Sequence, residues 1–127
     1  MAPERVAADS TLRVSPAERR VIEALLAAHL PGQEVRAFGS RATGRGLKRW
    51  SDLDLALMGA QSIAAATLAA LASAFDESDL PFRVDLLAWV DAPPALRQAI
   101  LADGVVVAAG AVKPVGTAPA AQSGRLE

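Results

Sequence analysis

Residues 34–58, EVRAFGSRATGRGLKRWSDLDLALM, contain the pattern from which the architecture of the chain can be predicted. Two apolar segments, 34–38 and 52–58, flank a polar loop that is rich in glycine and basic residues. Short runs of Val, Phe and Leu that are bounded by glycine and serine are typical of β-strands. The stretch therefore predicts two strands of one sheet, with Gly39-Ser40 at the exit of the first strand.

Helices and strands alternate on both sides of this stretch. Ser15 and Glu18 have the spacing of a capping box around Pro16, which favours a helix start. Apolar residues then recur at helical spacing until Pro31. The other predicted elements are a helix over 62–75, a strand over 82–87, a helix over 91–101 and a strand over 105–107. This order predicts an α/β (α+β) domain, in which a small mixed β-sheet has flanking helices and crossover connections.

The length of 127 residues suits one domain with a single core. We expect residues 1–14 to be an N-terminal extension and residues 15–110 to form the folded domain. Residues 111–127 are mostly Ala, Pro, Gly and polar residues without periodicity, so we expect a flexible C-terminal tail.

Composition excludes several classes of function. The 13 basic and 14 acidic residues give a net charge of -1, which argues against a domain that mainly grips a nucleic-acid backbone. The chain has no cysteine, which excludes disulfides, thiolate metal sites and cysteine nucleophiles. The longest apolar run, 63–75, is shorter than the roughly 20 residues that span a bilayer. With no signal peptide visible, we expect a cytoplasmic protein without membrane or direct nucleic-acid partners.

Asp52 and Asp54 form the first candidate functional pair. Residues two apart on a strand share a face, so these two carboxylates project together while Leu53 and Leu55 point into the core. Adjacent carboxylates repel each other unless a cation neutralises them, and Mg²⁺ prefers such hard oxygen ligands. The alternative is an exposed strand that carries two solvated aspartates.

Asp85 is the second candidate, because it is a lone acid between Val84 and Leu86 in an apolar strand segment. Charged residues are seldom placed among apolar neighbours without a partner. The alternative is that Asp85 pairs with Arg83 or faces water. Together with Asp52 and Asp54 it matches the carboxylate set that two-metal phosphoryl chemistry needs.

The loop supplies candidates for holding a nucleotide. Gly39 lets the backbone approach a ligand closely, and the Ser40 hydroxyl and nearby N–H groups can bind phosphate oxygens. The alternative is an ordinary turn. Arg41 is expected to contact the triphosphate, and Trp50 is a candidate for stacking on a base or a partner. Arg45, Lys48 and Arg49 are more typical of a solvated loop.

These motifs resemble those of the minimal nucleotidyltransferases of the DNA polymerase β superfamily. The resemblance rests on residues 38–44, 51–55 and 84–85, in the order Gly-Ser, Asp-x-Asp and a third aspartate, and it covers about residues 15–107. The family has about ten residues between Gly-Ser and Asp-x-Asp, whereas eleven separate Ser40 from Asp52 here. It implies a polymerase β-like fold and transfer of AMP from ATP with two Mg²⁺ ions. It also implies that Gly39 and Ser40 bind the β- and γ-phosphates. The implied metal ligands and catalytic residues are Asp52, Asp54 and Asp85.

The resemblance also implies a partner, because similar minimal proteins lack an acceptor-binding domain and pair with a separate helical protein. In the toxin–antitoxin version, the partner is a HEPN ribonuclease toxin that receives AMP on a tyrosine. This chain has no tyrosine, so such a modification would occur in trans. Two alternatives stay open: AMP transfer to a small molecule with a helical partner, and a binding-only antitoxin.

Overall fold

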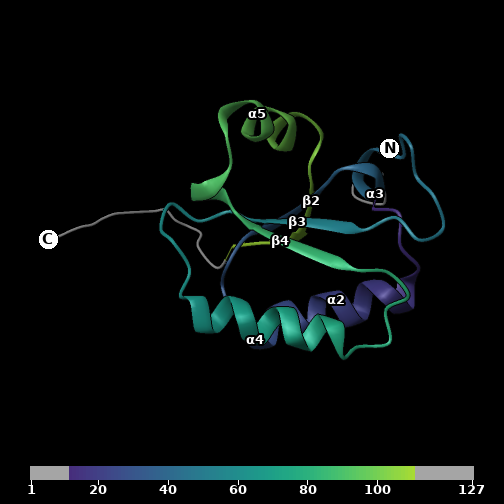
Figure 1. The fold of residues 1–127 in the computed structure, drawn as a ribbon, viewed down its shortest axis with the longest axis horizontal. Coiled ribbons are helices and arrows are strands. Elements are labelled where there is room, and N and C mark those ends of the chain that lie inside the picture. Colours follow the sequence, from purple (N-terminus) through teal and green to yellow (C-terminus); the bar gives the residue numbers. More distant parts are fainter. Residues whose placement is uncertain (1–11, 111–127) are drawn as a thin grey trace, which may run out of the picture.

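One mixed sheet with helices on both faces makes up the fold of residues 12–110, the part of the chain that the computed structural model describes (Figure 1). The predicted tail, 111–127, and most of the predicted N-terminal extension lie outside these residues. No helix within residues 12–110 is long and apolar enough to cross a membrane.

The strands are β2 (Val35–Phe38), β3 (Leu53–Leu57), β4 (Val84–Ala88) and β5 (Val105–Ala108), and they follow the order β4-β3-β2-β5 across the sheet. Strand β2 pairs antiparallel with both β3 and β5, whereas β3 and β4 run parallel. Helix α4 (Ala65–Asp76) makes the crossover between the two parallel strands. The predicted mixed sheet is therefore confirmed.

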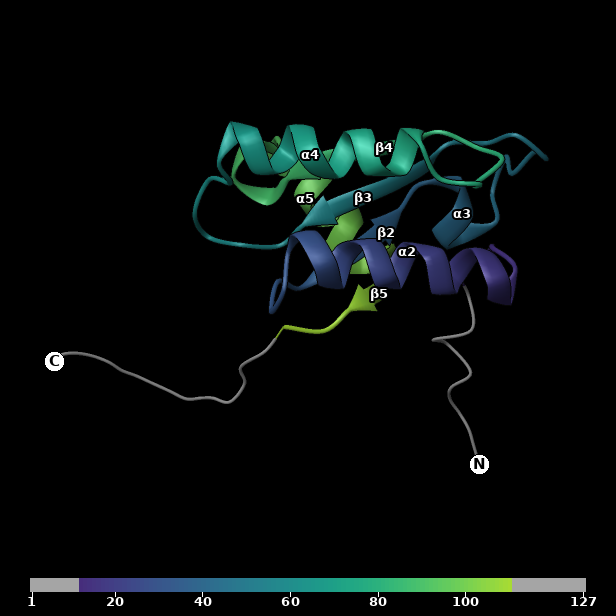
Figure 2. The same cartoon turned by 90° about the horizontal axis from the view of Figure 1, so that it is seen from below.

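Helices α2 (Pro16–His29) and α4 lie side by side on one face of the sheet (Figure 2). The predicted capping box starts α2, since the Glu18 amide donates to the Ser15 hydroxyl (3.0 Å) and the Ser15 amide donates to the Glu18 carboxylate (2.8 Å). Helix α5 (Pro94–Asp103) covers part of the opposite face beside β2 (Figure 1).

The main core lies between the sheet and the α2–α4 layer. Burial alternates along β3 as the sequence predicts at Leu53, Asp54 and Leu55: both leucines are fully buried, and Asp54 is half-buried on the other face. The other fully buried large side chains of this core are Ile22, Leu26, Val35, Leu57 and Leu71, whereas Ile100 is buried under α5 on the opposite face. Burying each such side chain stabilises the fold by about 1.5–3 kcal/mol, so this layer holds the sheet in place.

Several boundaries differ from the sequence-based expectations. Leu12 is buried in the core, so the domain begins at least three residues before the expected start at residue 15. Strand β3 begins at Leu53, which leaves Asp52 one residue outside the strand. Helix α4 begins at Ala65 rather than at residue 62.

Two one-turn helices were not predicted: α3 (Ser40–Thr43) and the 3₁₀ helix η2 (Trp89–Asp91). Both are too short to show a hydrophobic period, which explains why the pattern missed them. In α3, the Gly39 carbonyl accepts hydrogen bonds from the amides of Ala42 and Thr43, each at 3.0 Å.

Candidate active site

The predicted aspartates gather at one end of the sheet, where β2 ends and both β3 and β4 begin. Phe38 is the register partner of Asp54 in the antiparallel pair, and Asp54 is the register partner of Asp85 in the parallel pair. Directly paired residues on neighbouring strands point to the same face. The structure thus places Asp54 beside Asp85, on the face opposite the α2–α4 layer, with Asp52 just before β3.

The three carboxylates influence one another electrostatically. The pKa of Asp54 is raised to about 6, first by burial, then by the charge of Asp85 and then by the charge of Asp52. Asp52 and Asp85 themselves are exposed. A half-buried carboxylate that faces two others favours any cation able to neutralise the group.

Asp85 also has the neighbour that the alternative interpretation named. Its carboxylate lies 3.6 Å from the guanidinium of Arg83, and both side chains are largely exposed. An exposed pair at this distance contributes about 0–1 kcal/mol. Such a weak contact leaves Asp85 able to turn toward another partner.

The expected convergence of Asp52, Asp54 and Asp85 into one metal-sized pocket is not seen. Within residues 12–110, no group of three or more His, Cys, Asp or Glu side chains is arranged so that it could hold a metal ion. The donor chemistry nevertheless fits Mg²⁺, since all three groups supply carboxylate oxygens. Asp52 and Asp85 are both exposed, and carboxylates that no cation neutralises repel one another, so separated side-chain positions are favoured. Their role as metal ligands stays a prediction.

Gly39 lies directly against Asp54. Its backbone has φ 76° and ψ -157°, a region that is essentially restricted to glycine. A Cβ atom at this position would lie 2.5 Å from Asp54 Oδ2. The lack of a side chain therefore allows the Gly39-Ser40 turn and the Asp54 carboxylate to approach closely, as expected of a glycine beside a ligand site.

A groove of about 300 Å³ opens next to this turn, between α3 and α5. Gly39 and Ser40 form part of its wall, and Leu96 and Ala99 of α5 give it an apolar side. Its remaining lining residues are Phe38, Thr43, Arg45 and Asp103. The α5 wall was not predicted, because nothing in the chain pattern indicates that residues 94–103 pack beside residue 39.

Arg41 does not occupy the place that was expected for it. It is buried, with 6% of its surface exposed, and its guanidinium donates to the backbone carbonyls of Arg13, Arg49 and Ser51. Burial lowers the pKa of this guanidinium, and the charges of Glu18 and Asp52 partly oppose the change. All three nitrogens are engaged with the protein backbone, so the geometry gives no support to the expected contact with a nucleotide.

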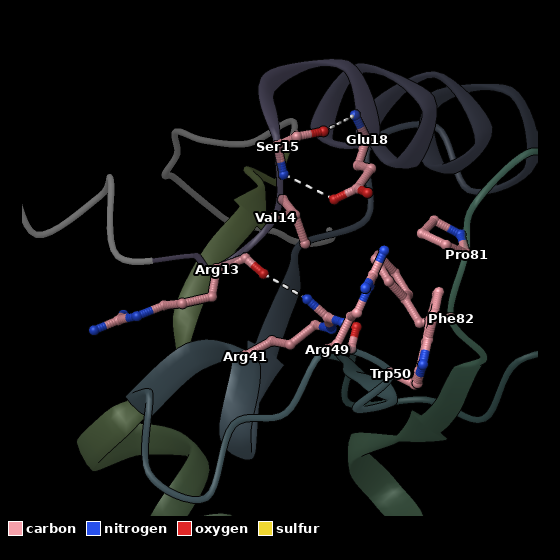
Figure 3. A pocket seen from close by; sticks show the side chains of 9 residues that line it. All are labelled: Arg13, Val14, Ser15, Glu18, Arg41, Arg49, Trp50, Pro81 and Phe82. Carbon is pink, nitrogen blue, oxygen red and sulfur yellow. Dashed lines mark hydrogen bonds between the residues drawn. The ribbon is translucent and has the colours of Figure 1, made fainter.

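A larger hollow, of about 550 Å³, lies at the N-terminal end of α2 (Figure 3). Figure 3 shows Arg41 on its floor and the rings of Trp50 and Phe82 on one side. The other lining residues are Arg13, Val14, Ser15, Glu18, Arg49 and Pro81, none of which is one of the three aspartates.

A further hollow, of about 410 Å³, adjoins this one and contains Asp52. Trp50 borders both hollows, is 61% exposed, and has the Arg49 guanidinium 5.0 Å from its ring centroid. A large exposed aromatic ring next to a site carboxylate is typical of a contact surface. The other basic residues of the loop, Arg45 and Lys48, are exposed, and Arg45 pairs with Asp103 at 3.2 Å.

Comparisons with known proteins show the family and the fold of the chain. The model of the polymerase beta nucleotidyltransferase family matches residues 22–110. A probable protein adenylyltransferase MntA from Haemophilus influenzae is 38% identical over 96 residues, which are 76% of this chain and 83% of that protein.

Solved structures show the same fold. A chain of a toxin–antitoxin crystal structure with AMP-PNP matches with a TM-score of 0.60 and 26% identity, over 73% of this chain and 74% of that one. A chain from a tri-AMPylated Shewanella oneidensis HEPN toxin in complex with an MNT antitoxin matches with a TM-score of 0.52 and 23% identity, over 73% and 71% of the two chains. At that identity, the second match supports the fold alone.

Proposed function

Because this chain belongs to the polymerase beta nucleotidyltransferase family, we propose that it transfers AMP from ATP to a hydroxyl of a partner protein. The observation that carries the proposal is the position of Asp54, which lies between the Gly39-Ser40 turn and Asp85. A phosphate-binding turn and a carboxylate group on adjacent strands bring the two ends of a phosphoryl-transfer site together.

The donor nucleotide fits the groove beside Gly39 and Ser40. The turn offers backbone amides and a hydroxyl to the phosphates, and the α5 wall offers the apolar surface of Leu96 and Ala99. Nucleotide sites commonly combine a few polar anchors with an apolar wall. We infer that the triphosphate enters along Gly39-Ser40, with its α-phosphate directed toward Asp54.

Mg²⁺ would be held by Asp52, Asp54 and Asp85. The raised pKa of Asp54 supports this, because a bound cation would offset the repulsion among the three carboxylates. Binding requires the exposed Asp52 and Asp85 side chains to rotate toward Asp54, a motion that takes picoseconds to nanoseconds on a surface. When bound, Mg²⁺ would neutralise the phosphate oxygens and lower the pKa of the acceptor hydroxyl. Two ions are the number that the family resemblance implies.

We infer that the acceptor is a tyrosine of a separate helical HEPN-type protein. The phenol oxygen forms a bond to the α-phosphorus, the bond to pyrophosphate breaks, and the phenol proton passes to a carboxylate or to solvent. Asp85 suits the acceptor side because β4 is an edge strand and its carboxylate is exposed. An unperturbed phenol has a pKa of about 10, so a nearby base or cation is needed at neutral pH.

Two relatives support the choice of a protein acceptor. The Haemophilus influenzae relative carries the name of a probable protein adenylyltransferase, and the structure at 26% identity is a toxin–antitoxin complex with AMP-PNP. This chain has no tyrosine of its own to modify. We therefore propose that the protein is the antitoxin of a toxin–antitoxin pair.

The test is incubation of the HEPN-type partner with ATP and Mg²⁺, followed by intact-mass and peptide analysis. The partner should gain the mass of AMP on a tyrosine. The Asp52→Ala, Asp54→Ala double variant should abolish the gain, and omission of Mg²⁺ should have the same effect. Asp79→Ala, an exposed loop aspartate outside the site, is the matched control and should transfer AMP at the wild-type rate.

The binding-only hypothesis receives its support from the same carboxylates, which are not gathered into a metal-binding group within residues 12–110. Toxin neutralisation in cells separates the two hypotheses. A double variant that still neutralises the toxin fully would show that catalysis is dispensable. Transfer of AMP to a small-molecule hydroxyl, with none to the partner, would instead favour the small-molecule alternative.

A further inference from the structure

Arg41 is the only charged or polar side chain that is buried among residues 12–110. Removing a guanidinium from water costs several kcal/mol unless its N–H groups are fully hydrogen-bonded. No carboxylate of residues 12–110 forms a salt bridge with it, and the charges of Glu18 and Asp52 offset only part of the cost from a greater distance.

Backbone carbonyls from two segments accept one hydrogen bond from each of the three guanidinium nitrogens. Nε donates to the Ser51 carbonyl (2.8 Å), one terminal nitrogen donates to that of Arg13 (2.8 Å), and the other donates to that of Arg49 (3.1 Å). The guanidinium carbon also lies 3.9 Å from the centroid of the Phe82 ring, which is a close cation–π contact. The bond to Arg13 is drawn in Figure 3.

Arg41 and its contacts at Ser51 and Phe82 lie within three residues of an expected site residue in the sequence. Arg41 itself follows Ser40, Ser51 precedes Asp52, and Phe82 lies three residues before Asp85. Arg41 therefore connects the Gly39-Ser40 turn to the segments that precede β3 and β4, the two strands beside which the aspartates lie.

We propose that Arg41 is a positioning residue, which fixes the Gly39-Ser40 turn relative to Asp52 and Asp85 during nucleotidyl transfer. The inference rests on the proposed function. A planar fork with fixed donor directions holds three carbonyls in one geometry, which a lysine ammonium on a flexible stem does not do. Displacing reactive groups by about 1 Å can cost on the order of 10²-fold in rate.

The test compares the steady-state AMP transfer of Arg41→Ala and Arg41→Lys with that of wild type, at a temperature where circular dichroism shows each variant folded. We expect kcat to fall on the order of 10²-fold in both variants. The KM for ATP should change less than about threefold, because Arg41 does not touch the nucleotide. Arg20→Ala and Arg20→Lys are the matched controls, since Arg20 is exposed on α2, and both should keep the wild-type kcat.

Chemical rescue provides a readout that general loss of structure does not mimic. Arg41 lines the 550 Å³ hollow, so a small cation can reach the space that Arg41→Ala leaves. Millimolar guanidinium should restore part of the kcat of Arg41→Ala and should leave Arg41→Lys and wild type unchanged. If Arg41→Ala does not fold, Phe82→Leu removes the ring contact while it keeps the carbonyl bonds, and it should lower kcat with an unchanged KM.

Unchanged kcat in the folded Arg41 variants would overturn the inference, as would a raised KM for ATP with normal kcat, which is the signature of a nucleotide contact. Failure of wild type to transfer AMP would instead sink the proposed function. In that case hydrogen exchange decides about Arg41. The Ser51 amide donates to the Lys48 carbonyl at 3.1 Å. Faster hydrogen exchange of this amide in Arg41→Ala than in wild type would support the positioning role, and equal exchange rates in the two proteins would reject it.

Discussion

The two faces of strand β3 differ in what their side chains contribute to stability. Leu53, Leu55 and Leu57 point into the α2–α4 layer and are at most 1% exposed. On the other face, Asp54 stands beside Asp85, and its raised pKa shows that its charge is poorly accommodated. The buried leucines lower the free energy of the fold, and the half-buried charge of Asp54 raises it.

The contrast indicates how the candidate site is maintained. Carboxylates that repel each other do not stay on adjacent strands unless other contacts determine the strand positions. The leucine face supplies those contacts, so the register that pairs Asp54 with Asp85 is set by packing on the other side of the sheet. Free energies of unfolding should therefore separate the two faces.

The largest effect is expected on the leucine face. Leu55→Ala should lower the free energy of unfolding by about 2–5 kcal/mol, because it removes buried surface and leaves a cavity. Urea denaturation is the measurement. Leu101→Ala makes the same deletion at a side chain that is 58% exposed, and it should change stability by less than about 0.5 kcal/mol. Equal losses in the two variants would remove the distinction.

The next effect concerns the contact between the turn and the carboxylate. Gly39→Ala should cost about 1–3 kcal/mol from the backbone conformation alone, and more because the new methyl group meets Asp54. Gly46→Ala is the control, since Gly46 also has a positive φ of 68°, but a methyl group added there would meet no atom within 4 Å. Thermal melting of both variants should show the larger loss at Gly39, and a larger loss at Gly46 would contradict the close approach.

On the aspartate face, a substitution should stabilise the protein. Asp54→Asn removes the half-buried charge, and in metal-free buffer it should raise the free energy of unfolding by on the order of 1 kcal/mol or less, since solvent screens part of the repulsion. The same variant should lose AMP transfer. A gain in stability with a loss of activity is the behaviour expected of a site residue.

The stability gained by Asp54→Asn should depend on pH. The folded-state pKa of Asp54 is raised to about 6, above the unfolded value, so the native state holds the proton more tightly. The contribution of Asp54 to stability should fall as pH rises from about 4 through 6, and the advantage of Asp54→Asn over wild type should appear over that range and stay constant above it. Asp79→Asn is the control. An advantage of Asp54→Asn that is the same at pH 4 and pH 8 would show that charge is not its cause.

The smallest effect on stability is expected at Trp50. Its ring is 61% exposed, so Trp50→Ala should change the free energy of unfolding by less than about 0.5 kcal/mol. Exposed aromatic residues are frequent hot spots of binding, and Trp50 borders the hollow that contains Asp52. The variant should therefore weaken the partner complex at least about tenfold, as measured by calorimetry. An unchanged Kd would place the partner elsewhere.

Local sequence patterns were enough to locate the elements and to indicate the chemical character of the site. Periodicity and capping signals located α2, α4, α5 and the four strands of residues 12–110 to within a few residues, because each has a hydrophobic pattern long enough to read. The alternation around Leu53-Asp54-Leu55 also predicted correctly that both leucines face the core and that Asp54 faces the other side, since the side-chain period of a strand is two.

Which groups meet, in contrast, followed from tertiary contacts alone. The folded chain pairs Asp54 with Asp85, brings the α5 wall to Gly39, and places Arg41 on backbone carbonyls rather than in the groove. These outcomes depend on contacts between distant segments and on the free-energy cost of burying charge. Local sequence patterns predict neither of them.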